Sequence, residues 1–412
     1  MANIKLQTLK QDNRRWFYII LGILINICLG TIYSWSVFRK PIEEILQITA
    51  TQSGLPYMSF LFIYAVTMPI AGKYIDKYSP RLISIIGGVM VGTGWFLASF
   101  AGNIYVLTAA YGLIGGAGVG VVYGVPISVA AKWFPDKKGL AVGLTLLGFG
   151  LSPLITANIA QRLIDYNGPF FTFRYLGISF LIIISLLSLA LKAPETVSQD
   201  KQAGKDINQK EIEKNRIKTT NKKAVNILKI PQFYFLWLCY FFGTFSGLMA
   251  IGVSNPVAEE IINLPAATAA LTVGIFAVFN GVGRPLYGWL TDTFSTRKAA
   301  LVSYILIILA SLMMLNAGEG ATVLYVIAFS LLWLNLGGWL AVAPAAVASF
   351  FGNENYSKNY GYLFTAYGAG AILGTVVSGS IRDWFGSYLY SFYPPIILSL
   401  LGIFIAGRYL KQ

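Results

Sequence analysis

Long apolar runs separated by short polar connections follow one another along almost the whole chain. We expect helices over residues 16–38, 53–75, 82–101, 104–131, 138–163 and 170–192, and again over 231–258, 266–290, 298–317, 321–350, 358–382 and 387–408. Because a helix needs about 20 apolar residues to cross the hydrocarbon core, each run is long enough to span a membrane. Only 12% of the residues are charged and the mean hydropathy is +0.64, which excludes a soluble enzyme. The pattern predicts an all-α membrane protein with twelve transmembrane helices.

A polar segment divides these runs into two sets of six. We expect an N-terminal six-helix bundle over residues 1–192, a cytoplasmic linker over 193–230 and a C-terminal six-helix bundle over 231–412. With both termini placed in the cytoplasm, 25 Lys and Arg residues fall on the cytoplasmic side and 5 on the outer side. This bias follows the positive-inside rule. It predicts a multi-pass protein of the cell (inner) membrane, monomeric, with the lipid bilayer rather than nucleic acid as the partner of its basic residues.

The residue types that usually carry catalysis are scarce. The chain has no histidine, and its two cysteines, Cys28 and Cys239, each lie inside an apolar run. There is no phosphate-cradling loop, no carboxylate within an apolar run and no soluble domain large enough for an active site or a sensor output. We therefore predict that the chain is not an enzyme and that it binds no metal or cofactor.

One loop pattern occurs twice, each time after the second helix of a set. Gly72 precedes Asp76, Lys77 and Arg81, and 216 positions later Gly288 precedes Asp292 and Arg297. The glycines would let helices approach, and the aspartates could cap a helix N-terminus or pair with arginine. This doubled pattern resembles the loop signature of the major facilitator superfamily, whose layout is also six plus six helices with a long middle loop. We expect these residues to act in conformational gating, as contacts between helices on the cytoplasmic side.

Arg284 is the one charged residue of the sequence that lies well inside an apolar run. Eight residues separate it from Asp292, which places it roughly 12 Å into a core about 30 Å thick. Burial at such depth costs at least about 2.5–3.5 kcal/mol. Because no carboxylate lies within the apolar runs, Arg284 is suited to bind an anion from outside, and its planar fork matches a carboxylate. The alternative is that the side chain reaches toward the inner surface and pairs with backbone carbonyls.

Two tyrosines accompany this arginine as candidate hydroxyl donors. Tyr33 lies in the stretch Tyr33-Ser-Trp35, and Tyr123 lies in a glycine-rich helix that ends in Lys132-Trp-Phe-Pro-Asp-Lys-Lys-Gly139. With Asn280-Gly-Val-Gly-Arg284-Pro285, these stretches resemble the oxalate/formate antiporter family and bacterial monocarboxylate transporters. The resemblance implies that Arg284 binds the substrate carboxylate and that Tyr123 lines the site. We include Tyr33 and Asn280 among the expected binding residues.

The sequence departs from that family at the eleventh helix. Oxalate-handling members carry a second cation there, and Tyr367 occupies that place here, while Leu336 and Leu340 stand where the tenth helix of the family has aromatic rings. One cation balances one carboxylate, so we expect a small monocarboxylate such as lactate, pyruvate, formate or acetate as substrate. Two alternatives remain: an oxalate/formate-type exchanger, or a carrier of a non-carboxylate solute in which Arg284 is structural.

Transport of an anion into a negative interior is opposed by about 2.3 kcal/mol per 100 mV, and a co-transported proton removes that penalty. Glu259 and Glu260, at the outer end of the seventh helix, are the carboxylates nearest the expected cavity mouth. They are candidates for proton coupling. The alternative interpretation makes both solvated residues at a helix end, and exchange of one monocarboxylate for another needs no proton site.

Overall fold

The structure, a computed structural model, describes residues 14–75, 77–194, 227–352 and 356–410. Helical segments occupy nearly all of this part of the chain. The N-terminal half contains α2 (Arg15–Leu29), η1 (Gly30–Ser34), α3 (Ser36–Leu46), α4 (Ala50–Ser53), α5 (Leu55–Ile75), α6 (Pro80–Ala98), α7 (Ile104–Leu107), η2 (Thr108–Gly115), α8 (Gly116–Val122), α9 (Gly124–Trp133) and α10 (Lys138–Ala190). The C-terminal half contains η3 (Ile227–Lys229), α13 (Pro231–Glu260), α14 (Ala266–Thr293), α15 (Thr296–Leu315), α16 (Thr322–Phe351), α17 (Tyr356–Phe385), η4 (Tyr388–Phe392) and α18 (Tyr393–Tyr409).

The described residues contain eleven segments that are long and apolar enough to cross a membrane. One of them, 52 residues within α10, would be about 78 Å long as a straight helix, which far exceeds a single crossing. It turns at Gly168, whose φ of 78° and ψ of 168° are not helical. Because a side chain is strained at such a positive φ, glycine suits this turn. The segment thus makes two crossings, and the expected total of twelve is confirmed.

Our sequence interpretation ended the first helix, 16–38, too early. In the structure, α3 continues to Leu46 and contains Arg39 and Lys40, which we had placed in an outer loop. Arg39 is only 1% exposed. Burial of this charge is tolerated because neighbouring oxygens accept hydrogen bonds from its guanidinium, as described below.

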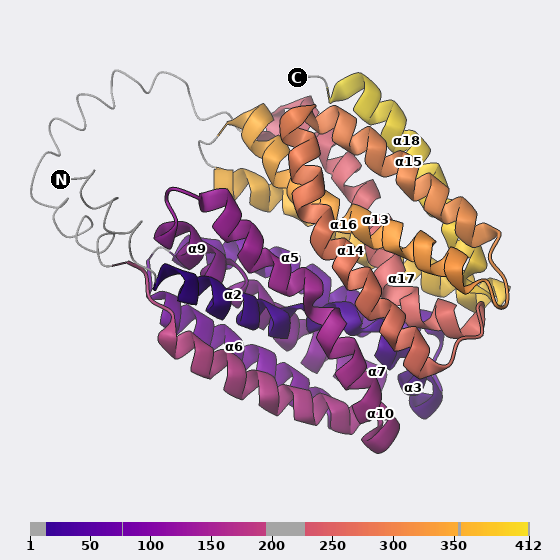
Figure 1. The fold of residues 1–412 in the computed structure, drawn as a ribbon. Helices are drawn as coiled ribbons and strands as arrows, with labels where there is room; N and C mark the ends of the chain where they lie inside the picture. Colours follow the sequence, from indigo (N-terminus) through magenta and orange to yellow (C-terminus); the bar gives the residue numbers. More distant parts are fainter. Residues whose placement is uncertain (1–13, 76, 195–226, 353–355, 411–412) are drawn as a thin grey trace, which may run out of the picture.

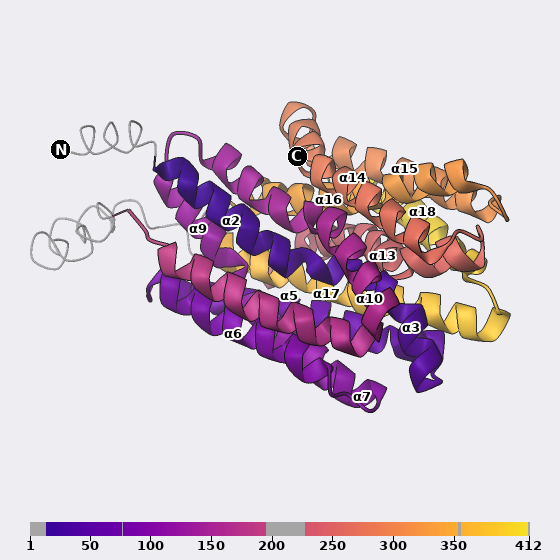
Figure 2. The same ribbon diagram turned by 60° about the horizontal axis from the view of Figure 1, so that its bottom comes forward.

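The helices form two groups, one from each half of the chain. Figure 1 shows most of the indigo-to-magenta helices gathered on one side and most of the red-to-yellow helices on the other, and in the turned view of Figure 2 α17 overlaps the N-terminal group. The most extensive contacts between the groups are those of α10 with α14 and of α5 with α17, and contacts of α4 with α17 and of α3 with α13 add to them. The helix ends near α3 lie close together in both views, whereas the start of α2 and the end of α18 lie apart.

The expected linker, 193–230, lies mostly outside the described residues, so the domain boundaries at 192 and 231 stay predictions. Just before it, the indole Nε1 of Trp133 donates to the carbonyl oxygen of Lys192 at 2.8 Å. The Trp133 ring stacks on Tyr18 at 4.6 Å between centroids, and Arg15 pairs with Asp136 at 3.1 Å. The tryptophan–phenylalanine–proline–aspartate loop therefore ties α2, α9 and the end of α10 together within the N-terminal half.

Candidate substrate-binding site

Two glycines of α14 set the position of Arg284 between the halves. A Cβ added to Gly281 would lie 3.0 Å from the Leu151 side chain on α10, and one added to Gly283 would lie 2.2 Å from the carbonyl oxygen of Leu334 on α16. The approach to the Leu334 carbonyl leaves no room for a side chain at position 283, and the contact with Leu151 is already tight at position 281. Helix α14 is thus held between α10 of the N-terminal half and α16 of its own half, and Arg284 emerges at their junction.

The guanidinium of Arg284 is buried and only partly hydrogen-bonded. Arg284 is 8% exposed, and its Nη1 donates to the carbonyl oxygen of Leu146 on α10 at 2.6 Å. Its Nε and Nη2 are buried without a hydrogen-bond partner. No other charged side chain in the described part of the chain has buried nitrogens in that condition. The backbone contact matches part of our alternative interpretation, but two of the three nitrogens remain available.

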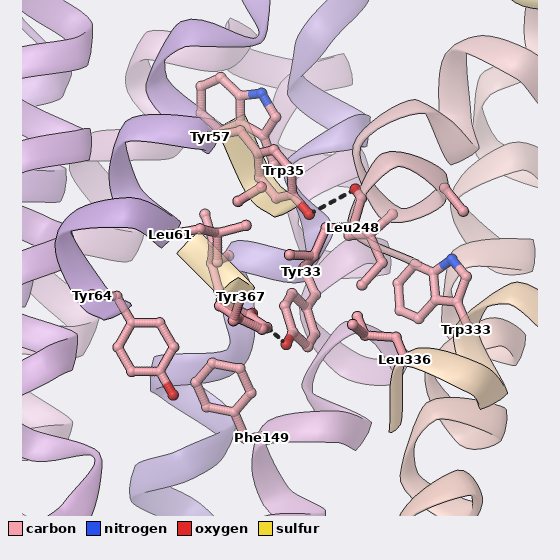
Figure 3. Close-up of a cluster of buried hydrophobic side chains, with 14 of the residues drawn as sticks. Tyr33, Trp35, Tyr57, Leu61, Tyr64, Phe149, Leu248, Trp333, Leu336 and Tyr367 are labelled. Atoms are coloured by element: carbon pink, nitrogen blue, oxygen red, sulfur yellow. Dashed lines mark hydrogen bonds between the residues drawn. The ribbon is translucent and has the colours of Figure 1, made fainter. Parts of the chain in front are cut away.

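The centre of the site joins the halves through a pair of tyrosines. The hydroxyls of Tyr33, on η1, and Tyr367, on α17, are hydrogen-bonded at 2.8 Å, and both side chains are buried. Figure 3 shows this bond within a cluster of rings that includes Tyr64, Phe149 and Trp333. The structure therefore brings together two residues, 334 positions apart, that we had selected separately from the sequence.

Tyr123 and Arg284 lie around the same cluster. The Tyr123 ring packs edge-on against Tyr64 and against Phe149, each at 5.3 Å between centroids. Arg284 approaches the same part of α10, since its partner Leu146 lies three residues before Phe149. Leu336, also drawn in Figure 3, is fully buried. One guanidinium with a free edge, beside a cluster of phenol hydroxyls and apolar rings, can bind a small anion that carries a short apolar part.

Asn280 lies one helical turn before Arg284 and is fully buried. Its Nδ2 donates to the carbonyl oxygen of Trp333 on α16 at 3.1 Å, while its Oδ1 has no partner. A Cβ added to Gly150 of α10 would lie 3.0 Å from this oxygen. The unpartnered amide oxygen therefore faces the same helix as the arginine.

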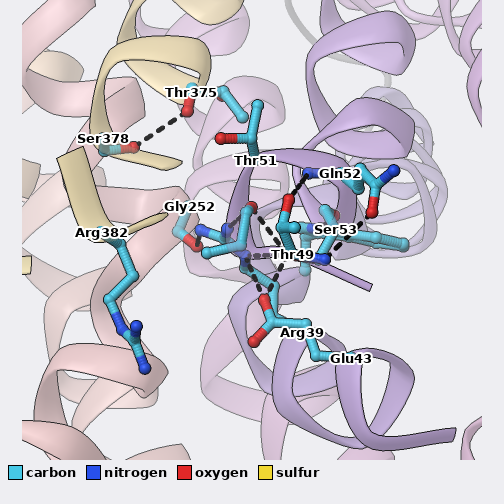
Figure 4. Close-up of polar contacts among 12 residues, drawn as sticks. Arg39, Glu43, Thr49, Thr51, Gln52, Ser53, Gly252, Thr375, Ser378 and Arg382 are labelled. Atoms are coloured by element: carbon cyan, nitrogen blue, oxygen red, sulfur yellow. Dashed lines mark hydrogen bonds and ion pairs between the residues drawn. The ribbon is translucent and has the colours of Figure 1, made fainter. Parts of the chain in front are cut away.

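A second buried arginine, Arg39, lies on α3 at one end of the molecule. The sequence interpretation missed its burial. The Nε of Arg39 donates to Ser53 Oγ at 2.9 Å, its Nη1 donates to the carbonyl oxygen of Gly252 at 3.2 Å, and its Nη2 donates to the carbonyl oxygen of Ala50. Its Nε lies 3.7 Å from Glu43 Oε1, and Ser53 Oγ also donates to this carboxylate. Figure 4 shows these contacts.

A sequence signal for this burial exists. Trp35, Phe38 and Ile42 recur at the spacing of one helix face, and Arg39 falls on the same face. All four side chains are buried.

Further polar contacts join the two halves at the same end. Lys40 Nζ lies 3.3 Å from Glu259 Oε2 on α13, and the two carboxylate oxygens of Asp383, on α17, accept from the backbone N–H groups of Ala50 and Thr51 at 2.9 and 3.0 Å. We call Arg39, Lys40, Glu43, Ser53, Glu259 and Asp383 the Arg39 cluster. Glu260 pairs instead with Arg382 of its own half at 2.7 Å. Both glutamates are therefore in ion pairs in this structure.

The repeated loops lie away from the central site. Lys77 and Asp292 are exposed, and Arg81 and Arg297 are half-buried. A Cβ added to Gly72 or Gly288 would meet nothing within 4 Å, so the close helix approach that we expected at these glycines is absent from this conformation. Asp76 lies outside the described residues.

The described residues contain no group of three or more acidic, cysteine or histidine side chains that could hold a metal. Cys28 and Cys239 are free and buried.

Relatives support a transporter. The chain is 29% identical to the oxalate:formate antiporter of Oxalobacter formigenes over 402 residues, which covers 96% of this chain and 92% of that protein. It is 26% identical to monocarboxylate transporter 1 of Bos taurus, with 94% and 83% coverage. These relatives are membrane transporters rather than enzymes.

Solved structures and a family model give the same result for the fold. A bacterial homologue of the human lysosomal transporter Spinster matches with a TM-score of 0.69 and 16% identity, covering 97% of each chain, a likeness that concerns the fold alone. The Major Facilitator Superfamily model matches residues 19–254 and 236–412, which together cover nearly the whole chain. The chain is therefore a multi-pass membrane transporter, not an enzyme, and belongs to the major facilitator superfamily.

Proposed function

We propose that this protein is a secondary active transporter of small monocarboxylate anions that works by alternating access of its two halves. The observation that carries the proposal is the free edge of Arg284. Because Leu146 occupies Nη1, the unpartnered nitrogens are Nε and Nη2, which form the side edge of the guanidinium. Two parallel N–H groups on one edge match the two oxygens of a carboxylate. The names of the relatives, an oxalate:formate antiporter and a monocarboxylate transporter, agree with a carboxylate substrate.

The charge of the site favours one carboxylate over two. By resemblance, oxalate-handling relatives carry a second cation on this helix, and Tyr367 stands at that position here. Its hydroxyl is hydrogen-bonded to that of Tyr33. The other deeply buried arginine, Arg39, is occupied by the oxygens of its own cluster. A dianion would keep about one unneutralised charge in a poorly solvated site, at a cost of several kcal/mol. Lactate, pyruvate, formate and acetate fit a single cation.

The basic residues of the loops support a definite orientation. If the protein lies in a bacterial-type inner membrane with both termini on the cytoplasmic side, the Arg39 cluster lies at the outer face. The polar contacts of the cluster then close the outer side. The opposite end of the molecule, where the start of α2 and the end of α18 lie apart, faces the cytoplasm. In this scheme the halves rock about the central site, and the cluster must separate for substrate to enter from outside.

The test is a competition panel with the purified protein in proteoliposomes. Uptake of labelled lactate is measured against unlabelled lactate, pyruvate, formate, acetate, oxalate, a neutral sugar and an amine. We expect the monocarboxylates to compete and the sugar and amine to have no effect. Competition by the sugar or the amine, with none by carboxylates, would instead make Arg284 structural.

A second candidate is an oxalate/formate-type exchanger, and the 29% identity to the oxalate:formate antiporter favours it. The same panel separates the two candidates. Stronger competition by oxalate than by lactate, together with uptake that requires a carboxylate inside the vesicle, would support the exchanger and contradict the monocarboxylate proposal.

Proton coupling is the remaining part of the proposal, with Glu259 as the carboxylate that accepts the proton. Its neighbours are Lys40 of the other half, Asn255, which donates at 2.5 Å, and the charges of Glu44 and Glu260. Opening of the outer side would separate Glu259 from Lys40 and leave its carboxylate without a cation. Protonation of Glu259 at that moment would offset the charge of the bound monocarboxylate. The proton and the anion would then cross together without net charge.

A matched pair of variants tests this role. Glu259→Gln should abolish the stimulation of lactate uptake by an outside-acidic pH gradient. Glu260→Gln, whose residue pairs within its own half, should retain it. Equal stimulation in both variants would contradict the role of Glu259 and leave monocarboxylate exchange as the transport mode.

A further inference from the structure

Resting on the proposed function, we infer that Asn280 makes the site selective for 2-hydroxy monocarboxylates. Arg284 binds the carboxylate, and the Asn280 amide oxygen accepts a hydrogen bond from the hydroxyl on the neighbouring carbon. The argument begins with two unpartnered groups of opposite character, the donors Nε and Nη2 of Arg284 and the acceptor Oδ1 of Asn280. An acceptor left unpaired in a protein interior is costly, so its position beside unpaired donors requires an explanation.

The orientation of the Asn280 amide follows from its one hydrogen bond. The Nδ2 group donates to the carbonyl oxygen of Trp333 at 3.1 Å, a contact that an amide oxygen could not make. The oxygen is therefore the atom turned away from α16, and it approaches α10 at Gly150. A larger residue at position 150 would press on this oxygen, since its Cβ would already lie 3.0 Å away.

Asn280 and Arg284 are four residues apart on α14, so their side chains lie on one helix face with Cβ atoms about 6 Å apart. Both face α10, where Gly150 and Leu146 are also four residues apart. A ligand with a carboxylate and a hydroxyl on the adjacent carbon is complementary to this face, which presents the Arg284 donors next to the Asn280 acceptor. Its carboxylate meets the arginine edge, and its hydroxyl proton meets the amide oxygen.

Other small acids cannot make both contacts. The 2-oxo group of pyruvate would turn a carbonyl oxygen toward the Asn280 oxygen, and two acceptors repel each other. Acetate, formate and propionate have no group to donate and leave the amide oxygen unpaired. Two other buried asparagines, Asn26 and Asn255, also have an unpartnered Oδ1. They lie on α2 and near the outer end of α13, and Asn26 provides a matched control.

The first experiment uses the unchanged protein. Binding of lactate, propionate and pyruvate to the purified full chain is measured by isothermal titration calorimetry. Propionate has the carbon skeleton of lactate without the hydroxyl. We expect lactate to bind about tenfold more tightly than propionate, the size of one good hydrogen bond, and pyruvate to bind no better than propionate. Equal affinities for lactate and propionate would overturn the inference while leaving the monocarboxylate site in place.

The second experiment removes the acceptor. Asn280→Leu should lower lactate affinity to that of propionate and change propionate affinity by less than about threefold, whereas Asn26→Leu should keep the preference. A folded Asn280→Leu variant that still prefers lactate would overturn the assignment. If that variant does not fold, the series on the unchanged protein decides. Absence of binding by every monocarboxylate would overturn both this inference and the proposed function.

Discussion

Two buried arginines make the most useful comparison in this molecule. Arg39 and Arg284 are 1% and 8% exposed, and each lies where the two halves meet. Arg39 donates to Ser53, Gly252 and Ala50, and Glu43 lies nearby, whereas Arg284 donates to Leu146 alone. The protein itself satisfies the first guanidinium and leaves one edge of the second unused. Burial of a charge therefore does not identify a binding site; the unsatisfied hydrogen-bonding groups do.

The comparison also concerns how each region can take part in transport. The Arg39 cluster contains paired groups from both halves and needs no ligand to hold them together. The Arg284 site has a single cation with no carboxylate partner in the described structure. We therefore expect substitutions in the cluster to alter stability and conformational balance, and substitutions in the site to alter binding.

The largest expected effect is on transport at the Arg284 site. Arg284→Lys keeps the positive charge but loses the two-nitrogen edge, so lactate uptake should fall by about ten- to a hundredfold, as for the loss of a charged hydrogen bond. Initial uptake rates in proteoliposomes measure this. Arg162→Lys, at an exposed position, is the control. Uptake by Arg284→Lys equal to that of the unchanged protein would show that Arg284 does not anchor the carboxylate.

The next prediction compares the stability of the two sites. Arg39→Met leaves the acceptors of the cluster without their donor and should destabilise the protein by about 3–5 kcal/mol, as for a broken buried charge network. Arg284→Met removes two unsatisfied buried nitrogens and one hydrogen bond, so its stability should change by less than about 1 kcal/mol. Thermal unfolding of both variants in the same detergent measures the difference. A greater loss of stability in Arg284→Met would reverse our interpretation of the two regions.

A smaller effect is expected from a second cation in the site. Tyr367→Lys should shift preference from lactate toward oxalate by about tenfold, because the added charge neutralises the second carboxylate of a dianion. The ratio of oxalate to lactate competition measures the shift, and Tyr362→Lys, on the same helix but partly exposed, is the control. An unchanged ratio in a folded Tyr367→Lys protein would mean that position 367 does not contact the substrate.

The smallest effect is expected at the Arg39 cluster. Asp383→Asn removes the charge that caps two backbone N–H groups of α4, and should favour opening of that end by about fivefold, or about 1 kcal/mol. Lactate affinity should change by less than about threefold.

A cysteine at Thr375, a buried residue near Gly54 of the other half, can report this opening. Its labelling by an impermeant thiol reagent should be faster with Asp383→Asn than with Asp165→Asn, a change at an exposed position. Identical labelling rates would show that Asp383 does not hold this end of the molecule closed.

The sequence by itself determined the architecture. Twelve apolar runs predict twelve membrane crossings because the thickness of the bilayer fixes the length of a spanning helix. Charge within an apolar run identified Arg284 for the same reason, since lipid tolerates such a residue only with compensation. The structure confirms the number of crossings, including the two that meet at Gly168.

Only the tertiary structure decided which polar groups have partners. The burial of Arg39, the bond between Tyr33 and Tyr367, and the free atoms of Arg284 and Asn280 depend on contacts between segments far apart in the chain. Local pattern sets the face on which a side chain lies but cannot give the oxygen or nitrogen that meets it. That choice is made when the segments pack together: α10 against α14 and α5 against α17 set the contacts at the centre, and α3 against α4 and α13 sets those of Arg39.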